Sequence, residues 1–296
     1  MTADQYIMNV FEIAALNYPG SIRKRIKFFF RVMLYGQQCV TKISGIFNDP
    51  RLKQIILKNP SHYTKIFRPY LHKGLRINDR VLSINNHYEF VKKYWNAKLM
   101  HAVYHEKWMR LADISFDKES QFHIVMQQSS KQYENEGELI IGIFNHHKII
   151  SVCFNFTKNK NGDRGIYISS AQGSSKKDFP ETKDTIKYFT KNMGGMRPQA
   201  LLIFVLTVIA STYRLKNILA VKTASHIKCK RIKTNLDVLW ADMGGTPLDK
   251  ISYSLPIHYQ RKSIDNIKTN KRAMYKRRYA MLDQVENQIR CSLTQR

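Results

Sequence analysis

The first third of the chain places apolar and basic residues at helical spacing. Its apolar residues recur at the i, i+3 and i+4 intervals of an amphipathic helix, with cations between them. The apolar positions are Ile22, Ile26, Phe29, Phe30, Met33 and Leu34, and the basic positions are Arg23, Lys24, Lys27 and Arg31. Further helices are predicted over 37–47, 50–58 and 85–101, separated by proline-containing turns. The pattern predicts a mainly helical region.

The middle of the chain changes to short runs of β-branched and aromatic residues. These runs cover 122–126, 139–144, 149–156 and 165–169, and turn-forming residues at 145–148 and 159–163 separate the later ones. Such spacing is typical of an antiparallel meander. A helix over 181–192, a buried helix over 198–213 and a strand over 218–222 are predicted to follow, so the fold class is α+β.

The end of the chain, from 266 to about 289, lacks Gly and Pro and predicts a long helix with Asn270 as its cap. Its basic residues are Lys268, Lys271, Arg272, Lys276, Arg277 and Arg278, interleaved with Tyr275 and Tyr279. These cations suit the phosphates of nucleic acid, lipid headgroups or lipopolysaccharide. The alternative is a helix that docks on the core and covers it with arginine stems.

Three regions follow from these patterns. We predict a helical basic N-terminal region over 1–110, an α+β core over 111–262 and a basic C-terminal helix over 263–296, docked on the core. The 296 residues carry a formal net charge of +27, and 19 basic against 6 acidic residues lie in 1–110. The charge therefore predicts an anionic partner and a basic frame around a less charged core.

The compartment is predicted from what the sequence lacks. The longest apolar run, 200–210, is shorter than the roughly 20 residues of a membrane span. Asp4 and Glu12 precede the first basic cluster, unlike a signal peptide. The four cysteines are far apart, so no metal site is expected. We expect a cytoplasmic protein, peripheral at the inner membrane.

Acidic and histidine residues of the middle region are candidates for chemistry. Glu134, Glu136 and Glu138 alternate at the entry to a predicted strand, which places them on one face as a general-base or cation cluster. Neutralisation by neighbouring lysines and arginines is the alternative. His146 and His147 adjoin in a turn with no carboxylate nearby in sequence, which favours a solvated loop over a catalytic pair.

Two loops and one histidine are candidates for binding. Residues 171–175, with Gln172 and Gly173, follow the last meander strand and offer backbone N–H groups to a phosphate, although they match no phosphate-loop motif. Arg197 precedes the buried helix, where it would hold an anion or pair with a carboxylate such as Glu138. His226 follows the last strand and serves either structure or catalysis.

Several of these segments together resemble the VirK/YbjX family of enterobacterial proteins, from about residue 85 onward. The matching pieces, in order, are EGEL at 136–139, AQG at 171–173, MRPQALL at 196–202, ILAV at 218–221 with His226, Trp240 with Gly244 and Gly245, and KRAMYKRRY at 271–279. The resemblance implies virulence, resistance to cationic antimicrobial peptides, and surface display or secretion of virulence proteins. The core is also similar to that of GNAT acyltransferases.

Three functions follow as hypotheses. The first is a virulence-associated accessory protein of the bacterial envelope, peripheral to an anionic membrane or a lipopolysaccharide-related lipid. The second is a GNAT-like acyltransferase that uses acyl-CoA or acyl carrier protein, with Gln172, Gly173 and Arg197 near the carrier phosphates and Glu138 or His226 as general base. The third is RNA binding that regulates a virulence gene.

Overall fold

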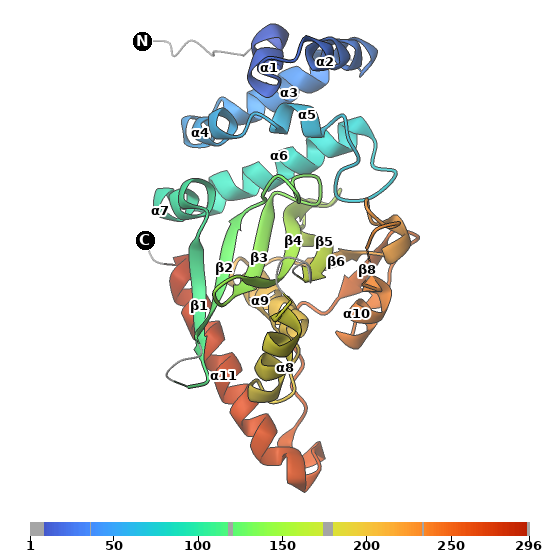
Figure 1. Ribbon diagram of the computed structural model, residues 1–296. Helices are drawn as coiled ribbons and strands as arrows, with labels where there is room; N and C mark the ends of the chain where they lie inside the picture. Colours follow the sequence, from blue (N-terminus) through green and yellow to red (C-terminus); the bar gives the residue numbers. More distant parts are fainter. Residues whose placement is uncertain (1–8, 36, 118–120, 174–179, 233, 295–296) are drawn as a thin grey trace.

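The computed structural model describes residues 9–35, 37–117, 121–173, 180–232 and 234–294. In these residues helices and strands form one mixed arrangement around a single continuous apolar cluster that runs from Ile13 to Leu293. Figure 1 shows a layer of helices at one end of a twisted sheet, with further helices along the sheet itself. The α+β prediction is confirmed at this level.

The N-terminal layer is helical, as predicted. Asn9 and Glu12 form a capping box at its start, and Asp49 with Pro50 begins α4. Its helices are α1 (Val10–Asn17), α2 (Ile22–Tyr35), α3 (Gln37–Phe47), α4 (Pro50–Lys58), α5 (His62–Lys65), α6 (Ile77–Tyr94) and α7 (Ala97–His101), followed by the short π-helical turn η1 (Ala102–Glu106).

The helix predicted over 85–101 is wrong in its bounds. The chain forms two helices there, because the Asn96 side chain accepts the Leu99 N–H and caps a new helix after α6 has ended at Tyr94. α6 begins earlier than predicted and crosses the ends of the central strands (Figure 1).

The described residues form one eight-stranded sheet in the order β1-β2-β3-β4-β5-β6-β8-β7. The strands are β1 (Met109–Ser115), β2 (Gln121–Gln128), β3 (Leu139–Phe144), β4 (Lys148–Lys158), β5 (Arg164–Gly173), β6 (Asn217–Val221), β7 (Thr246–Pro247) and β8 (Ser252–Leu255). β2 to β5 form the predicted antiparallel meander, and β1 adds a further antiparallel strand beside β2. β1 was not predicted, because a bulge at Arg110 interrupts its alternation, and it spans the expected 110/111 boundary.

The only parallel pairing among the described strands joins β5 to β6. The chain between them forms α8 (Thr182–Asn192) and α9 (Pro198–Thr212), both predicted, and returns to the sheet. Pairing stops at Ile168 and Ala220, whereas β5 continues to Gly173 beside β4 alone. The two parallel strands therefore separate towards the carboxyl end of β5. After β6 the chain forms the short turn η2 (Thr223–Ser225) and α10 (Leu236–Asp242).

The two faces of the sheet are covered differently. α9 packs on one face with nearly all of its side chains buried, each large aliphatic one contributing about 1.5–3 kcal/mol. On the opposite face, the loop over 129–137 packs Tyr133 against Ile140 and Cys153 as a separate small cluster. That second face also carries polar side chains of β4 and β5.

α11 (Thr269–Thr294) is the long C-terminal helix that the sequence predicts, extended to Thr294. The short turn η3 (Ile264–Asn266) precedes it. Its second half packs on β1 and α9 through Leu282, Val285, Ile289 and Leu293. Its basic first half projects past the sheet, at the opposite end of the molecule from α1 and α2 (Figure 1). The two most basic parts of the chain are therefore separate surfaces.

A bilayer-crossing helix is not found in the part of the chain that the structure describes, since each helix there is too short or too polar.

Candidate functional site

Glu138 lies at the centre of a buried polar network between the helical layer and the sheet. Its Oε1 accepts from Lys65 Nζ at 2.7 Å and from the Tyr70 hydroxyl at 2.6 Å. Its Oε2 accepts from the Tyr88 hydroxyl at 2.9 Å and lies 3.3 Å from His62 Nδ1. Each of these five side chains is at most 2% exposed.

Backbone and amide groups complete the network. Asn155 of β4 accepts the Glu138 N–H at 2.7 Å and donates from Nδ2 to the Tyr70 hydroxyl at 2.8 Å. His87 of α6 accepts the Phe156 N–H at 3.2 Å and meets the Tyr104 hydroxyl at 2.9 Å. The helices α5, α6 and η1 are thus tied to β3 and β4 by polar contacts inside the core.

The charge states follow from burial and from one cation. Burial opposes ionisation of Glu138, but the Lys65 ammonium outweighs it and holds the pKa of the carboxyl below its usual value. Burial, with Lys65, lowers the pKa of His62 to about 3. Burial also lowers the pKa of His87 to about 4. The network is therefore a lysine–carboxylate ion pair with neutral histidines around it.

These contacts favour a positioning role for Glu138. A general base needs a carboxylate that reaches a substrate proton, whereas this carboxylate is sealed and has hydrogen bonds on both oxygens. The expected alternative pairing of Arg197 with Glu138 is wrong, because Lys65 occupies that position and Arg197 is exposed elsewhere.

Glu136 organises a second cluster and is fully buried. Its Oε2 accepts from Gln172 Nε2 at 2.5 Å, and its Oε1 lies 2.5 Å from Lys228 Nζ. His226 is buried beside this pair. Its Nδ1 accepts the Lys228 N–H at 3.0 Å, and its Nε2 has no hydrogen-bond partner among the described residues. Burial lowers the pKa of His226. Gln172 and His226 are thus brought together.

The three glutamates do not form the expected cluster on one face. Residues 131–136 form turns before β3 begins at Leu139, so the period-two alternation of a strand does not apply. Each carboxylate has its own cation: Arg68 for Glu134, Lys228 for Glu136 and Lys65 for Glu138. The neutralisation alternative is confirmed.

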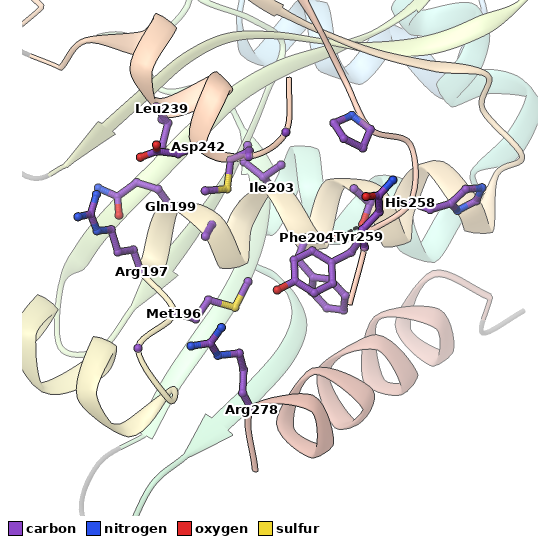
Figure 2. A pocket seen from close by; sticks show the side chains of 17 residues that line it. Met196, Arg197, Gln199, Ile203, Phe204, Leu239, Asp242, His258, Tyr259 and Arg278 are labelled. Atoms are coloured by element: carbon purple, nitrogen blue, oxygen red, sulfur yellow. Dashed lines mark hydrogen bonds between the residues drawn. The ribbon is translucent and has the colours of Figure 1, made fainter. Parts of the chain in front are cut away.

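Arg197 lines a pocket of about 470 Å³ beside the N-terminus of α9. Figure 2 shows Arg197 and Arg278 on either side of Met196. Arg278 comes from α11, 81 positions later, and its Nε donates to the Gly194 carbonyl at 2.9 Å. Asp242, His258 and Tyr259 also contribute to the lining. The pocket joins α9, α10, α11 and the segment 256–260.

The pocket contains one of the five residues expected to bind a carrier or act on it. Gln172 and Gly173 lie at the end of β5 and do not line it, nor do Glu138 and His226. Gly173 is exposed, and a side chain there would be in ordinary van der Waals contact with the Ile149 carbonyl oxygen. Ser174 and Ser175 of the expected phosphate loop fall outside the described residues.

The basic block of α11 divides into two groups. Arg272 donates to the Ile267 and Asp265 carbonyls, and Arg278 to the Gly194 carbonyl, so both hold the backbone near the start of the helix. Lys271, Lys276 and Arg277 are exposed. The helix therefore combines both alternatives: some of its basic side chains bind the backbone of neighbouring segments, and the others form an exposed basic surface.

His147 has a carboxylate neighbour that its sequence context did not reveal. Its Nδ1 lies 3.4 Å from Glu181 Oε1 at the start of α8, whereas His146 is exposed. No group of three or more metal-ligating side chains is found within the described ranges. Cys39 and Cys153 are buried, Cys229 is half-buried and Cys291 is exposed.

Sequence reasoning missed Lys65, Tyr70, Tyr88 and Arg278's place in the pocket. Lys65 lies in a mixed polar and apolar stretch, between Thr64 and Ile66, so nothing in its local sequence indicates that it is buried against an anion. The tyrosines carry no such signal either.

The fold and these contacts define an α+β protein that buries a lysine–carboxylate pair beneath a helical layer and holds two arginines at a pocket beside its central helix. The chain belongs to the family described as "Protein of unknown function (DUF535)", whose model matches residues 19–291. The VirK/YbjX assignment is thereby confirmed.

Relatives of the chain come from two bacteria. It is 25% identical over 274 residues to "Uncharacterized protein YbjX" of Escherichia coli K12, covering 90% of this chain and 82% of the relative. It is 21% identical over 270 residues to an "Uncharacterized protein" of Haemophilus influenzae, covering 89% and 88%. No solved structure matches the chain significantly.

Proposed function

We propose that this protein is an accessory protein of the bacterial envelope that binds peripherally to an anionic lipid surface. In this role it supports the processes that the family resemblance implies, namely antimicrobial-peptide resistance and the surface display or secretion of virulence proteins. The observation that carries the proposal is an exposed apolar stripe on α2, bordered by cations.

The stripe consists of large side chains that are left in solvent. On α2, Ile22, Ile26, Phe30, Met33 and Leu34 are 73%, 48%, 60%, 78% and 76% exposed. Their spacing places them on one side of the helix, while Phe28 and Val32 pack inward on another. Phe11 of α1, 74% exposed, lies against Phe29 and extends the apolar surface. Contiguous apolar surface of this kind marks an interaction site.

The flanking charges indicate what the stripe contacts. Arg23, Lys24 and Lys27 are exposed. In the helical projection Lys27 borders the stripe next to Leu34, Arg23 lies between Phe30 and Leu34, and Lys24 lies farther round on the polar side. The region 1–110 has 19 basic residues against 6 acidic. An apolar face with a lysine- and arginine-rich border is typical of helices that lie in the membrane interface. Each cation near an anionic surface adds about 1 kcal/mol.

The first prediction concerns this stripe. We expect the double variant Phe30→Ser/Met33→Ser to weaken binding to vesicles containing phosphatidylglycerol by about tenfold or more, because two large apolar side chains no longer enter the interface. Co-sedimentation with vesicles measures the effect. Leu248→Ser, which removes another exposed leucine (57%), serves as the control and should bind normally.

Salt and lipid composition test the electrostatic part. Binding should fall at 1 M salt, where the screening length is roughly 3 Å, and on vesicles of neutral lipid. Binding that survives Phe30→Ser/Met33→Ser but is lost on replacing Lys271, Lys276 and Arg277 would move the contact to α11. Tighter binding to RNA than to anionic vesicles at matched salt would contradict the lipid proposal.

A second candidate function is supported by the Arg197 pocket. We infer that the core is of GNAT type and that Arg197 and Arg278 bind the phosphates of an acyl carrier. Three features support the inference. β5 and β6 pair in parallel, the two strands separate beyond Ile168, and α9 lies between them in sequence. One feature differs from GNAT acyltransferases, in which a short loop joins the strand to the phosphate-binding helix. In this chain α8 lies between β5 and α9, so the connection is longer.

The second prediction follows from the two arginines. We expect coenzyme A to bind in calorimetry and Arg197→Gln or Arg278→Gln to weaken it by about 10- to 100-fold, since each removes a charge-assisted hydrogen bond. Lys276→Gln, on the same turn of α11 but exposed, is the control. Absence of binding by coenzyme A would remove this candidate and leave the lipid proposal intact.

A further inference from the structure

Lys73 and Cys229 approach each other more closely than a hydrogen bond permits. Lys73 Nζ lies 2.6 Å from Cys229 Sγ. Bonds of the N–H···O type span about 2.7–3.2 Å, and sulfur is larger than oxygen, so an N–H···S bond is longer still. The contact therefore requires an explanation beyond ordinary hydrogen bonding.

The backbone fixes both residues in this position. The Lys73 N–H donates to the Ser225 carbonyl at 2.8 Å, and the Leu71 N–H donates to the Asn135 carbonyl at 2.9 Å. Leu71 is buried with φ at +58°, a left-handed conformation that a branched side chain adopts only under constraint. On the other side, the Cys229 N–H donates to the His226 carbonyl at 3.0 Å. The approach of the two side chains is thus built into two anchored segments.

The surroundings suit a reactive pair. Lys73 is exposed and Cys229 is half-buried, so small oxidants reach both atoms. His226 lies nearby: burial lowers its pKa, Glu136 opposes this shift, and the cations Lys228 and Lys73 add to it. Its buried Nε2 has no hydrogen-bond partner among the described residues.

We propose that Lys73 and Cys229 form a covalent cross-link through a single oxygen atom, Nζ–O–Sγ. The covalent radii implied by ordinary C–N and S–S bonds place nitrogen and sulfur about 2.6 Å apart when both are bonded to one bent oxygen. The observed separation is 2.6 Å, so the link closes without movement of either segment. A direct S–N bond would require the atoms to move much closer together.

The oxidant is a peroxide, and the step balances with two equivalents. The first peroxide oxidises the Cys229 thiol to a sulfenic acid and releases one water. The second oxidises the Lys73 amine while the sulfenic oxygen is retained between sulfur and nitrogen, releasing two waters. The Lys73 ammonium first releases one proton to solvent. Sulfur and nitrogen then each lose two electrons, the S–H bond and one N–H bond of the neutral amine are broken, and the four electrons reduce both peroxides, so that thiol, amine and two peroxides give the link and three waters.

The cross-link joins parts of the fold that are distant in sequence. Lys73 precedes α6 in the helical layer, Cys229 follows β6 in the sheet region, and 156 positions separate them. Closing so long a segment constrains the unfolded chain, as a disulfide does. The link is a redox-dependent tie between the two regions, reversible by thiols.

Mass spectrometry of peroxide-treated protein tests the proposal. We expect the intact mass to gain one oxygen and lose two hydrogens, and a proteolytic digest to contain one cross-linked species carrying Lys73 and Cys229. Dithiothreitol should abolish it. Lys73→Arg and Cys229→Ser should each prevent it, whereas Cys291→Ser, which removes an exposed cysteine, should leave it unchanged.

Thermal unfolding supplies an independent readout. The oxidised protein should unfold about 5 °C above the reduced protein, and Cys229→Ser should lose this difference. Three results would overturn the proposal: sulfenic or sulfinic acid at Cys229 with Lys73 unmodified, loss of two hydrogens without gain of oxygen, or a disulfide in place of the lysine link. Each is distinguished by mass.

Discussion

Replacing Glu138 with alanine is expected to lower the free energy of unfolding by about 3–5 kcal/mol, because it leaves the Lys65 ammonium buried without its counter-charge. Lys65 Nζ and Glu138 Oε1 are 2.7 Å apart, with side chains 2% and 1% exposed. The two tyrosine hydroxyls that donate to this carboxylate also lose their acceptor. For a protein of ordinary stability, this is a large part of the total. Urea unfolding followed by circular dichroism measures the loss.

Two further variants show whether the loss comes from the ion pair. Lys65→Met/Glu138→Ala removes both charges and should recover part of the stability lost in Glu138→Ala alone. Asp283→Ala breaks the half-exposed pair with Arg261 and should cost no more than about 1 kcal/mol. If the double variant loses the sum of the two single losses, the charges are not coupled and the network does not act as described.

Much of the secondary structure could be predicted because its signals are local. The helices over 37–47 and 50–58 have the bounds that the sequence indicates, and the meander strands follow their apolar runs and turns. β1 and β8 were missed for physical reasons: the bulge in β1 interrupts its alternation, and the pairing of β8 depends on a partner strand rather than on its own pattern. β8, for example, is four residues long and forms its ladder with β6.

The candidate site could be predicted only as a set of unusual residues. Glu138 was recognised as a polar residue at the start of a strand, but its partners Lys65, Tyr70 and Tyr88 precede it by 50 to 73 positions and belong to the helical layer. Arg197 and Arg278 were both recognised, yet only the docking of α11 beside α9 brings them to one pocket. Local sequence indicates which residues are unusual, and tertiary packing decides which of them meet.

The buried network around Glu138 leads to the second large prediction, which is a loss of stability in mild acid. The folded pKa values of His62, about 3, and His87, about 4, lie below the value of about 6.5 in an unfolded chain. Between these values the unfolded state binds protons that the folded state does not, so the free energy of unfolding falls as the pH falls. The slope is about 1.4 kcal/mol per pH unit for each histidine.

Urea unfolding at pH 7.5, 6.0 and 5.0 tests this expectation. Below about pH 4 the free energy of unfolding should fall more steeply, because the carboxyl of Glu138 then also takes up a proton in the unfolded state. His226 and His72, whose pKa values burial likewise lowers, add in the same direction. His62→Gln should reduce the slope by about one proton's contribution, whereas His146→Gln, at an exposed position, should leave it unchanged. A free energy of unfolding that stays constant from pH 7.5 to pH 5.0 would show that these histidines are not held neutral by the fold.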